Sequence, residues 1–283
     1  MSLDSVPTEE IAPFLLEAGG RIETTDIGNH RVDVWIPDEV SSGTPILVMH
    51  DGENIFYPEY TFHNQTWGIL QAIAHGRIVA DCMPIVVAVW GLRGEHAFDK
   101  SRMYELAPQD LLVANPDLYQ MLDKAEFQVE QLAGNRYQSL LAEEIVPTVA
   151  NKYGVSLDRR RTAIMGSSMG GLASLYGMAK HPDVYGAALC LSTHVAFWDP
   201  AFVPSLVDLL PSPGSHFVWT DRGSINLDSQ YEQPHRDVIA ALLSKGYTRD
   251  VDFQAHIFDG TDHNELAWSR RIEYPLNWWL SNC

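Results

Sequence analysis

The sequence of 283 residues predicts an α/β fold, with a mostly parallel central sheet, helices on both of its faces and an antiparallel hairpin near the N-terminus. Two observations predict it. Short apolar runs of strand length recur along the chain, as is typical of parallel strands that are buried on both faces. Most of these runs are separated by segments whose apolar residues lie three and four positions apart, which predicts helices. This alternation favours a sheet covered by helices.

The predicted elements follow in order along the chain. Residues 21–27 and 30–36 alternate apolar and polar side chains across Gly28-Asn29, which predicts the hairpin. The expected later strands are residues 45–49, 85–90, 161–165, 186–191, 216–220 and 252–258. The expected helices are residues 67–80, 135–153, 170–181, 233–246 and 264–280.

The chain shows no internal repeat, low-complexity tract or Gly/Ser linker, so we expect residues 1–283 to form a single domain. Residues 109–134 are the exception to the regular alternation, because they have no strand pattern but contain several apolar side chains. They are expected to form a cap-like insertion over a pocket or a simple surface excursion of short helices.

The composition excludes several classes of protein. With 19 basic and 37 acidic side chains the net charge is −18, which disfavours binding to nucleic acid. No apolar run reaches the roughly 18 residues of a membrane span, and no secretion signal is evident at the N-terminus. Cys82, Cys190 and Cys283 have no metal-site spacing and fit a reducing compartment. We therefore expect a cytoplasmic protein; the sequence does not indicate its oligomeric state.

The strongest local signal is a glycine-rich turn with the pattern G-x-S-x-G at 166–170, followed by Gly171. It comes directly after an expected strand and directly before an expected helix, where a serine becomes exposed on a strained turn. The helix places backbone N–H groups and a positive dipole end near any oxyanion that forms there. The two common phosphate-binding glycine patterns are absent. Ser168 is therefore predicted to be a nucleophile.

A serine hydroxyl needs an adjacent base to take its proton. His263 lies in a polar loop between the last expected strand and the last expected helix, which is where this arrangement places the base. His256 falls within the strand and is expected to pack there, so His263 is predicted to be the base.

The third member of such a site is a carboxylate that holds the imidazole in the correct tautomer. The loop after the strand at 216–220 offers two candidates. Asp221 lies at the strand end, and Asp228 lies eight residues beyond Thr220. We favour Asp228 and retain Asp221 as the alternative acid.

The oxyanion of an acyl transfer needs two backbone N–H donors. One is expected from Met169, the residue after the nucleophile. The other is expected from Glu53, because the loop at 50–56 follows an early strand and Gly52 lets its backbone approach a substrate.

Several side chains near these loops are candidates for a substrate pocket, although most aromatic residues at strand ends pack in the core. Arg102 is a further candidate, which either binds a substrate carboxylate or pairs with Glu105. The aromatic candidates are Phe56, Trp67, Trp90 and Trp198.

The chain resembles the putative esterase family of α/β-hydrolases, which includes enterochelin (siderophore) esterases and feruloyl esterases. The resemblance implies an α/β-hydrolase sandwich, ester hydrolysis by Ser-His-acid and no metal or organic cofactor. One departure is that many relatives carry an acidic residue soon after the glycine of the acid loop, where this chain has Ile225 and Asn226. The segments that carry the resemblance are residues 50–56, 102–108 and 166–171 with Trp67, His263 and Trp268.

The resulting hypothesis is a serine carboxylic ester hydrolase that forms an acyl-enzyme with a small-molecule ester of siderophore or aryl type. An acyltransferase of the same fold and an inactive hydrolase-fold binding protein are the alternatives. A metal-dependent hydrolase built on His50, Asp51 and His63 is disfavoured, because no H-x-x-x-H or H-E-x-x-H motif is present.

Overall fold

The computed structural model describes residues 17–61, 64–92, 101–119 and 127–283. Its centre is an eight-stranded sheet in the order β1-β2-β4-β3-β5-β6-β7-β8. The strands are β1 (Arg21–Ile27), β2 (His30–Ile36), β3 (Ile46–Met49), β4 (Ile85–Val89), β5 (Thr162–Ser167), β6 (Ala187–Leu191), β7 (Phe217–Arg222) and β8 (Phe253–Ile257).

The pairing of the strands confirms the predicted fold class. β1 and β2 form an antiparallel hairpin in which Ile27 pairs with His30, and β2 is antiparallel to β4. All pairs from β4 across to β8 are parallel. Because parallel strands end at the same edge, the loops that follow β3, β5, β6, β7 and β8 gather there, as in other open α/β sheets.

The helices depart from the sequence prediction in length and continuity. Residues 135–153 are helical throughout, but a π-helical stretch at Leu140–Ile145 joins two α-helices. The helix expected at 67–80 is only six residues long, and that expected at 264–280 is interrupted by a turn at 270–272. The α-helices are α2 (Ile69–Ala74), α3 (Ser101–Leu106), α4 (Gln109–Ala114), α5 (Gly134–Ser139), α6 (Val146–Tyr153), α7 (Met169–Lys180), α8 (Phe202–Asp208), α9 (Glu232–Lys245), α10 (Glu265–Ser269) and α11 (Glu273–Leu280).

Short 3₁₀ helices lie in the connecting loops, and two of them belong to the site described below. These two are η1 (Gly52–Asn54) and η8 (Asn226–Tyr231). The others are η2 (Pro58–Tyr60), η4 (Pro116–Tyr119), η5 (Val129–Gln131) and η7 (Arg159–Arg161).

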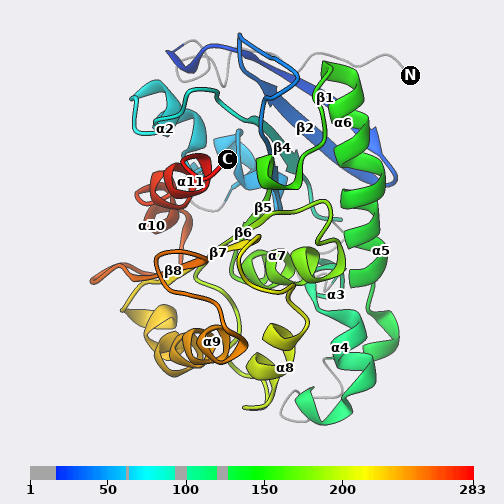
Figure 1. Ribbon diagram of the computed structural model, residues 1–283, viewed down its shortest axis with the longest axis vertical. Coiled ribbons are helices and arrows are strands. Elements are labelled where there is room, and N and C mark those ends of the chain that lie inside the picture. Colours follow the sequence, from blue (N-terminus) through cyan, green and yellow to red (C-terminus); the bar gives the residue numbers. More distant parts are fainter. Residues whose placement is uncertain (1–16, 62–63, 93–100, 120–126) are drawn as a thin grey trace.

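Two hydrophobic clusters lie on the two faces of the sheet. Along β3, Val48 belongs to the cluster under α7, and its neighbours Leu47 and Met49 belong to the cluster under α11. This alternation follows from the period of two in a strand. Figure 1 shows α5, α6 and α7 on one side of the sheet and α2, α10 and α11 on the other.

The insertion predicted at 109–134 contains α4 and two 3₁₀ helices, and residues 120–126 lie outside the described residues. Leu111, Leu112 and Leu118 are buried in the core cluster. Whether the segment caps a substrate stays a prediction, since no described residue of it lines the cavity around Ser168. Of the helices in the described ranges, none is long and apolar enough to cross a membrane.

Candidate active site

Ser168 lies on the turn between β5 and α7 in a strained backbone conformation, with φ 55° and ψ −122°. Positive φ is uncommon for a residue with a side chain, and such outliers cluster at functional sites. The turn is tight because a Cβ on Gly166 would lie 2.5 Å from the backbone carbon of Gly170. Two backbone bonds hold it from the side of β6, from Ser168 N to Leu191 O at 2.9 Å and from His194 N to Ser168 O at 3.0 Å.

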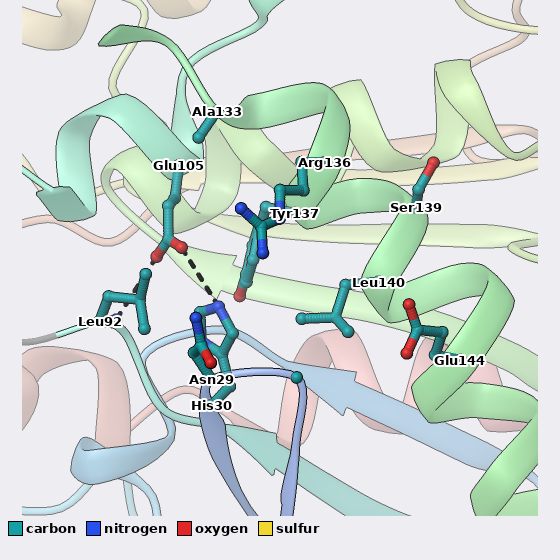
Figure 2. A pocket seen from close by; sticks show the side chains of 11 residues that line it. Asn29, His30, Leu92, Glu105, Ala133, Arg136, Tyr137, Ser139, Leu140 and Glu144 are labelled. Atoms are coloured by element: carbon teal, nitrogen blue, oxygen red, sulfur yellow. Dashed lines mark hydrogen bonds and ion pairs between the residues drawn. The ribbon is translucent and has the colours of Figure 1, made fainter.

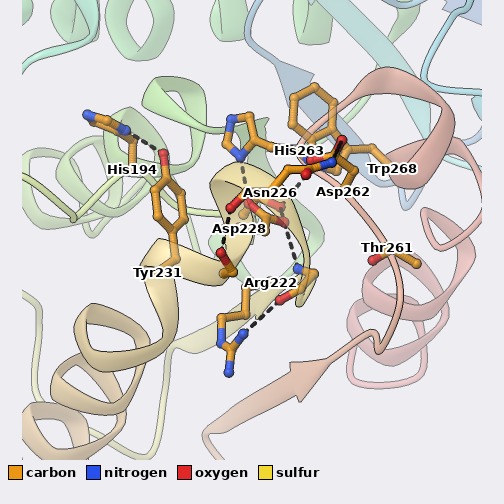
Figure 3. Close-up of polar contacts among 12 residues, drawn as sticks. His194, Arg222, Asn226, Asp228, Tyr231, Thr261, Asp262, His263 and Trp268 are labelled. Atoms are coloured by element: carbon orange, nitrogen blue, oxygen red, sulfur yellow. Dashed lines mark hydrogen bonds and ion pairs between the residues drawn. The ribbon is translucent and has the colours of Figure 1, made fainter.

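His263 lies in the loop between β8 and α10, and its Nδ1 is 2.6 Å from Asp228 Oδ1 (Figure 3). Asp228 is fully buried in η8, and its Oδ2 accepts bonds from Ser192 Oγ and from the Gly223 N–H, both at 2.6 Å. Burial favours a higher pKa for Asp228, but the bonds from His263, Ser192 and Gly223 outweigh it and lower the pKa below its usual value. The carboxylate is therefore kept ionised beside the imidazole.

Asp221 has a different set of partners at the end of β7. Its Oδ1 accepts a bond from Ser192 N at 3.1 Å and pairs with Arg271 Nη2 at 2.9 Å. Its Oδ2 accepts a bond from Trp219 Nε1 at 2.8 Å. Burial raises the pKa of Asp221 even though these donors favour the ionised form. Its bonds thus go to Arg271, to Trp219 and to the backbone, whereas Asp228 contacts His263.

Arg271 is the buried cation of this corner, with 1% of its surface exposed. Its Nη2 donates to Ser192 Oγ at 2.6 Å and lies 3.9 Å from Asp228 Oδ2. The same hydroxyl accepts a bond from Trp268 Nε1 at 3.1 Å. No local motif marks Arg271 or Ser192, so the sequence did not reveal them; the turn at 270–272 is what directs Arg271 inward.

The loop predicted to hold the oxyanion donor follows β3 and contains η1. Asp51 has φ 55° and forms a two-point ion pair with Arg102, from Nε to Oδ1 at 2.5 Å and from Nη2 to Oδ2 at 2.7 Å. A Cβ on Gly52 would lie 2.7 Å from the Ala88 backbone, so the close approach requires glycine. Glu53 Oε2 accepts a bond from Gly91 N at 3.2 Å. The loop is thereby fixed at three successive residues.

The pairing expected between Arg102 and Glu105 is wrong. Arg102 binds Asp51, and Glu105 Oε1 instead lies 3.2 Å from His30 Nε2. The two side chains lie three residues apart on α3 and contact different partners. An ion pair on an exposed helix surface stabilises by only a few tenths of a kcal/mol, so the tertiary contacts outweigh it.

A second cavity of about 250 Å³ lies at the His30–Glu105 pair (Figure 2). His30 Nδ1 donates to the Trp90 carbonyl at 2.7 Å, and Leu92 N donates to Glu105 Oε2 at 3.4 Å. Burial alone would lower the pKa of His30, but Glu105 and the carbonyl raise it above its usual value. Two ion pairs therefore connect α3 to other parts of the chain: Arg102–Asp51 to the loop after β3, and Glu105–His30 to the hairpin.

Ser168 and His263 line the same cavity, which has a volume of about 430 Å³. Of the predicted pocket residues, Trp67 and Arg102 line it. Phe56, Trp90 and Trp198 are buried and do not line it; Trp198, for example, stacks on Phe202 at 4.6 Å. The lining residues are Asp51, Glu53, Asn54, Tyr60, Trp67, Arg102, Ser167, Ser168, His263, Asn264, Glu265 and Trp268.

Two residues that the sequence did not reveal stand beside Ser168. The Tyr231 hydroxyl lies 2.5 Å from His194 Nδ1 and is within hydrogen-bonding reach of the Ser168 side chain. Burial, and then the nearby His263 and Arg102, lower the pKa of His194 to about 4, so its imidazole is neutral at pH 7. Burial raises the pKa of Tyr231.

In the part of the chain that the structure describes, no group of three or more His, Cys, Asp or Glu side chains is arranged to hold a metal ion. His50 is fully buried, and its Nδ1 lies 2.9 Å from the Tyr137 hydroxyl. His63, the other histidine of the metal-site alternative, lies outside the described residues.

The model of a known family, described as Putative esterase, matches residues 28–242. The chain belongs to this family. The match includes the turn of Ser168 and the loop of Asp228 and ends before His263, which the structure brings to Asp228.

Individual proteins match this chain at low sequence identity. YbbA of Bacillus subtilis (strain 168), an uncharacterized protein, is 22% identical over 268 residues, which cover 92% of this chain and 96% of YbbA. The enterobactin esterase FES from Shigella flexneri, solved in the presence of enterobactin, has 15% identity and a TM-score of 0.61. That match covers 93% of this chain, which spans only 59% of the FES chain.

Two further structures match over nearly their whole length. The enterobactin hydrolase IroE, in complex with DFP, has 18% identity and a TM-score of 0.62, and the match covers 95% of this chain and 99% of that one. A ferulic acid esterase has 15% identity and a TM-score of 0.56, with 94% and 99% covered. These structures confirm the α/β-hydrolase sandwich.

Proposed function

We propose that this chain is a serine carboxylic ester hydrolase in which Ser168 is the nucleophile, His263 the base and Asp228 the carboxylate that orients it. The observation that carries the proposal is the 2.6 Å contact between His263 Nδ1 and the buried Asp228, together with the cavity that His263 and Ser168 both line. An ionised carboxylate only accepts hydrogen bonds, so Nδ1 carries the proton and Nε2 is left as the proton acceptor.

The first half-reaction forms an acyl-enzyme. His263 Nε2 takes the proton of Ser168 Oγ as the oxygen attacks the ester carbonyl, and Asp228 stabilises the imidazolium that forms. The proton then passes from Nε2 to the leaving alcohol. In the second half-reaction His263 takes a proton from water as the water attacks the acyl carbonyl. The bond from the acyl carbon to Ser168 Oγ then breaks, His263 returns the proton to Oγ, and the carboxylic acid leaves.

The negative charge on the carbonyl oxygen needs donors that are already in place. Met169 is the first residue of α7, so its N–H has no acceptor within the helix and is available to the oxyanion. The Glu53 N–H is the proposed second donor. The Asp51–Arg102 ion pair and the bond from Gly91 N to the Glu53 carboxylate support it by fixing the loop.

The cavity supports a small-molecule ester as the substrate, since its volume is in the range of small-molecule sites and its wall includes Tyr60, Trp67 and Trp268. Solved relatives are described as esterases of enterobactin and of ferulic acid, which supports an ester of siderophore or aryl type.

The test is a panel of p-nitrophenyl esters of graded acyl length beside feruloyl and catecholate esters. Wild-type protein is expected to hydrolyse at least one of these classes. Ser168→Ala should lower turnover by about 10³-fold or more, because the hydroxyl that carries the covalent step is gone.

Ser167→Ala is the matched control, because Ser167 lines the same cavity but lies at the end of β5 and not on the turn. It should keep most of the activity. If the Ser168→Ala protein is folded by circular dichroism and retains more than a few per cent of wild-type activity, the proposal is wrong.

A further inference from the structure

The short helix η8 directs two side chains toward the proposed catalytic residues. Asp228 and Tyr231 lie three positions apart in it, and side chains at this spacing face the same way in a 3₁₀ helix. Asp228 contacts His263. The Tyr231 hydroxyl is within hydrogen-bonding reach of the Ser168 side chain, and its ring makes an edge contact with His263, with centroids 5.4 Å apart. Figure 3 shows both side chains beside His263, so one short helix lies against the base and the nucleophile.

Tyr231 approaches Ser168 from the protein interior and not from the substrate side. It is 1% exposed and does not line the cavity that Ser168 and His263 share. Burial raises the pKa of Tyr231, so its hydroxyl keeps its proton and can donate a hydrogen bond at neutral pH. A contact from this side acts on the nucleophile, because the substrate lies in the cavity.

His194 holds the Tyr231 hydroxyl from its other side. Its Nδ1 lies 2.5 Å from the hydroxyl oxygen, and the two ring centroids are 5.7 Å apart. The backbone N–H of His194 donates to the Ser168 carbonyl at 3.0 Å, which fixes the histidine next to the nucleophile. Burial lowers the pKa of His194 to about 4, so its imidazole carries a single N–H and stays neutral when His263 becomes charged.

Ser168 Oγ can have two partners at once. A serine hydroxyl has one proton to donate and two lone pairs with which to accept. In the proposed mechanism its O–H donates to His263 Nε2, which leaves a lone pair for the Tyr231 hydroxyl. A donor at that position holds the oxygen in place and stabilises the negative charge that develops on it as the proton leaves.

We propose that the Tyr231 hydroxyl donates a hydrogen bond to Ser168 Oγ and that His194, by donating from Nδ1 to the Tyr231 oxygen, orients the hydroxyl to do so. This inference rests on the proposed function and adds two residues to it. Tyr231 acts on the nucleophile directly, and His194 is a positioning residue that acts through Tyr231. The other tautomer of His194 would accept the Tyr231 proton and leave the phenol oxygen to compete with His263 for the Ser168 proton.

The test begins with Tyr231→Phe, which removes the hydroxyl and keeps the ring. Its kcat should fall about 10- to 100-fold, the scale of a hydrogen bond to a charged group, with KM nearly unchanged. The loss should be the same for p-nitrophenyl esters of different acyl length, because the lost contact is with the nucleophile. The rate at which a fluorophosphonate labels Ser168 should fall by a similar factor, because the same oxygen attacks the probe.

Variants of His194 test whether it acts through Tyr231. His194→Ala should lower kcat about three- to tenfold, because the hydroxyl remains but loses its orientation. The double variant Tyr231→Phe/His194→Ala should be no slower than Tyr231→Phe alone. His194→Asn keeps an N–H donor near the position of Nδ1 and should be faster than His194→Ala.

Tyr247→Phe is the matched control. Tyr247 follows α9, is 2% exposed and donates from its hydroxyl to the Pro211 carbonyl at 2.8 Å, so this variant also removes a buried, bonded phenol hydroxyl. Its kcat and its labelling rate should equal those of wild type.

The outcomes distinguish this inference from the proposed function. If wild-type protein neither hydrolyses an ester nor labels, the proposed function is overturned and this inference with it. If wild-type protein is active and folded Tyr231→Phe matches it in kcat and labelling rate, only this inference is overturned. A loss that appears in KM and differs among the esters also overturns it, since Tyr231 would then act on the substrate. If Tyr231→Phe does not fold, His194→Ala decides, and a kcat equal to that of wild type overturns the inference.

Discussion

Two arginine–aspartate pairs stand on opposite sides of the proposed nucleophile and differ in burial. At the acid corner, Arg271 and Asp221 are 1% and 0% exposed, and Asp228 lies beside them. At the oxyanion loop, Asp51 is 3% exposed but Arg102 is 39% exposed. Breaking a buried pair leaves an uncompensated charge, whereas a half-exposed arginine is largely solvated. The Arg271–Asp221 pair should therefore contribute more to the stability of the fold. The Asp51–Arg102 pair should act mainly on the geometry of the loop that contains Glu53.

The largest effect is expected from Arg271→Met, which removes the cation between Asp221 and Asp228. It leaves two buried carboxylates close together without their counter-charge, so the free energy of unfolding should fall by about 3–5 kcal/mol. Urea unfolding followed by circular dichroism measures this. Arg270→Met, at the exposed neighbouring position, is the control. A loss below about 1 kcal/mol for Arg271→Met would mean that the corner does not depend on this cation.

A smaller effect, mainly on rate, is expected from Arg102→Met. Without the two-point contact the strained Asp51 turn loosens and the Glu53 N–H is less well placed, so kcat should fall about tenfold, less than the loss of a whole oxyanion donor. Because Asp51 is left buried without its partner, the free energy of unfolding should also fall, by about 1–3 kcal/mol, which is less than for Arg271→Met with its two buried carboxylates. The lysine of Arg102→Lys cannot make both bonds at once, so the kcat of this variant should lie between those of wild type and Arg102→Met.

The kinetic parameters distinguish two roles for Arg102. A lower kcat with nearly constant KM is expected for a positioning residue. A raised KM with unchanged kcat would show instead that Arg102 binds a substrate carboxylate directly, as its place in the cavity wall permits.

The smallest effect, a pH-dependent change in stability, is expected at the His30–Glu105 pair between β2 and α3. The pKa of His30 is raised in the folded state, so the pair stabilises fully below about pH 6.5 and loses this contribution as pH rises through the folded pKa. The stability lost on Glu105→Gln should therefore be larger at pH 6 than at pH 9, by about 1 kcal/mol.

Urea unfolding at the two pH values measures the difference, with Glu144→Gln as the control. Glu144 is exposed on the wall of the same cavity. A destabilisation that is equal at both pH values would mean that the His30 charge does not contribute.

Much of the fold could be predicted from the sequence because its signals are local. The strand runs and the turn of Ser168 depend on residues within a few positions of one another, and the structure has a strand at each expected place. The broken helix at 270–272 was not predicted, because a buried Arg271 requires partners that lie 50 and 79 residues away, Asp221 and Ser192.

A residue type and its place along the chain were enough to single out Ser168 and His263, which the structure brings to one cavity, and their catalytic roles stay a prediction. The sequence did not separate pocket residues from core residues where packing decides. Trp198, one of the five pocket candidates, has its ring in the core, whereas Trp67 lines the cavity. The partner of Arg102 lies 51 residues away, so helix spacing alone suggested Glu105 instead.

The most direct test of the account compares kcat/KM for an active p-nitrophenyl ester between Asp228→Asn and Asp221→Asn. Asp228→Asn keeps the shape of the side chain but favours the wrong tautomer of His263, an effect that reaches about 10⁴-fold in a Ser-His-Asp protease, so we expect a loss of about 10²-fold or more. Asp221→Asn should destabilise the fold through Arg271 but change kcat/KM by less than about tenfold at a temperature where it is folded. The reverse result, a large loss in folded Asp221→Asn and a small one in Asp228→Asn, would contradict the assignment of Asp228 as the triad acid.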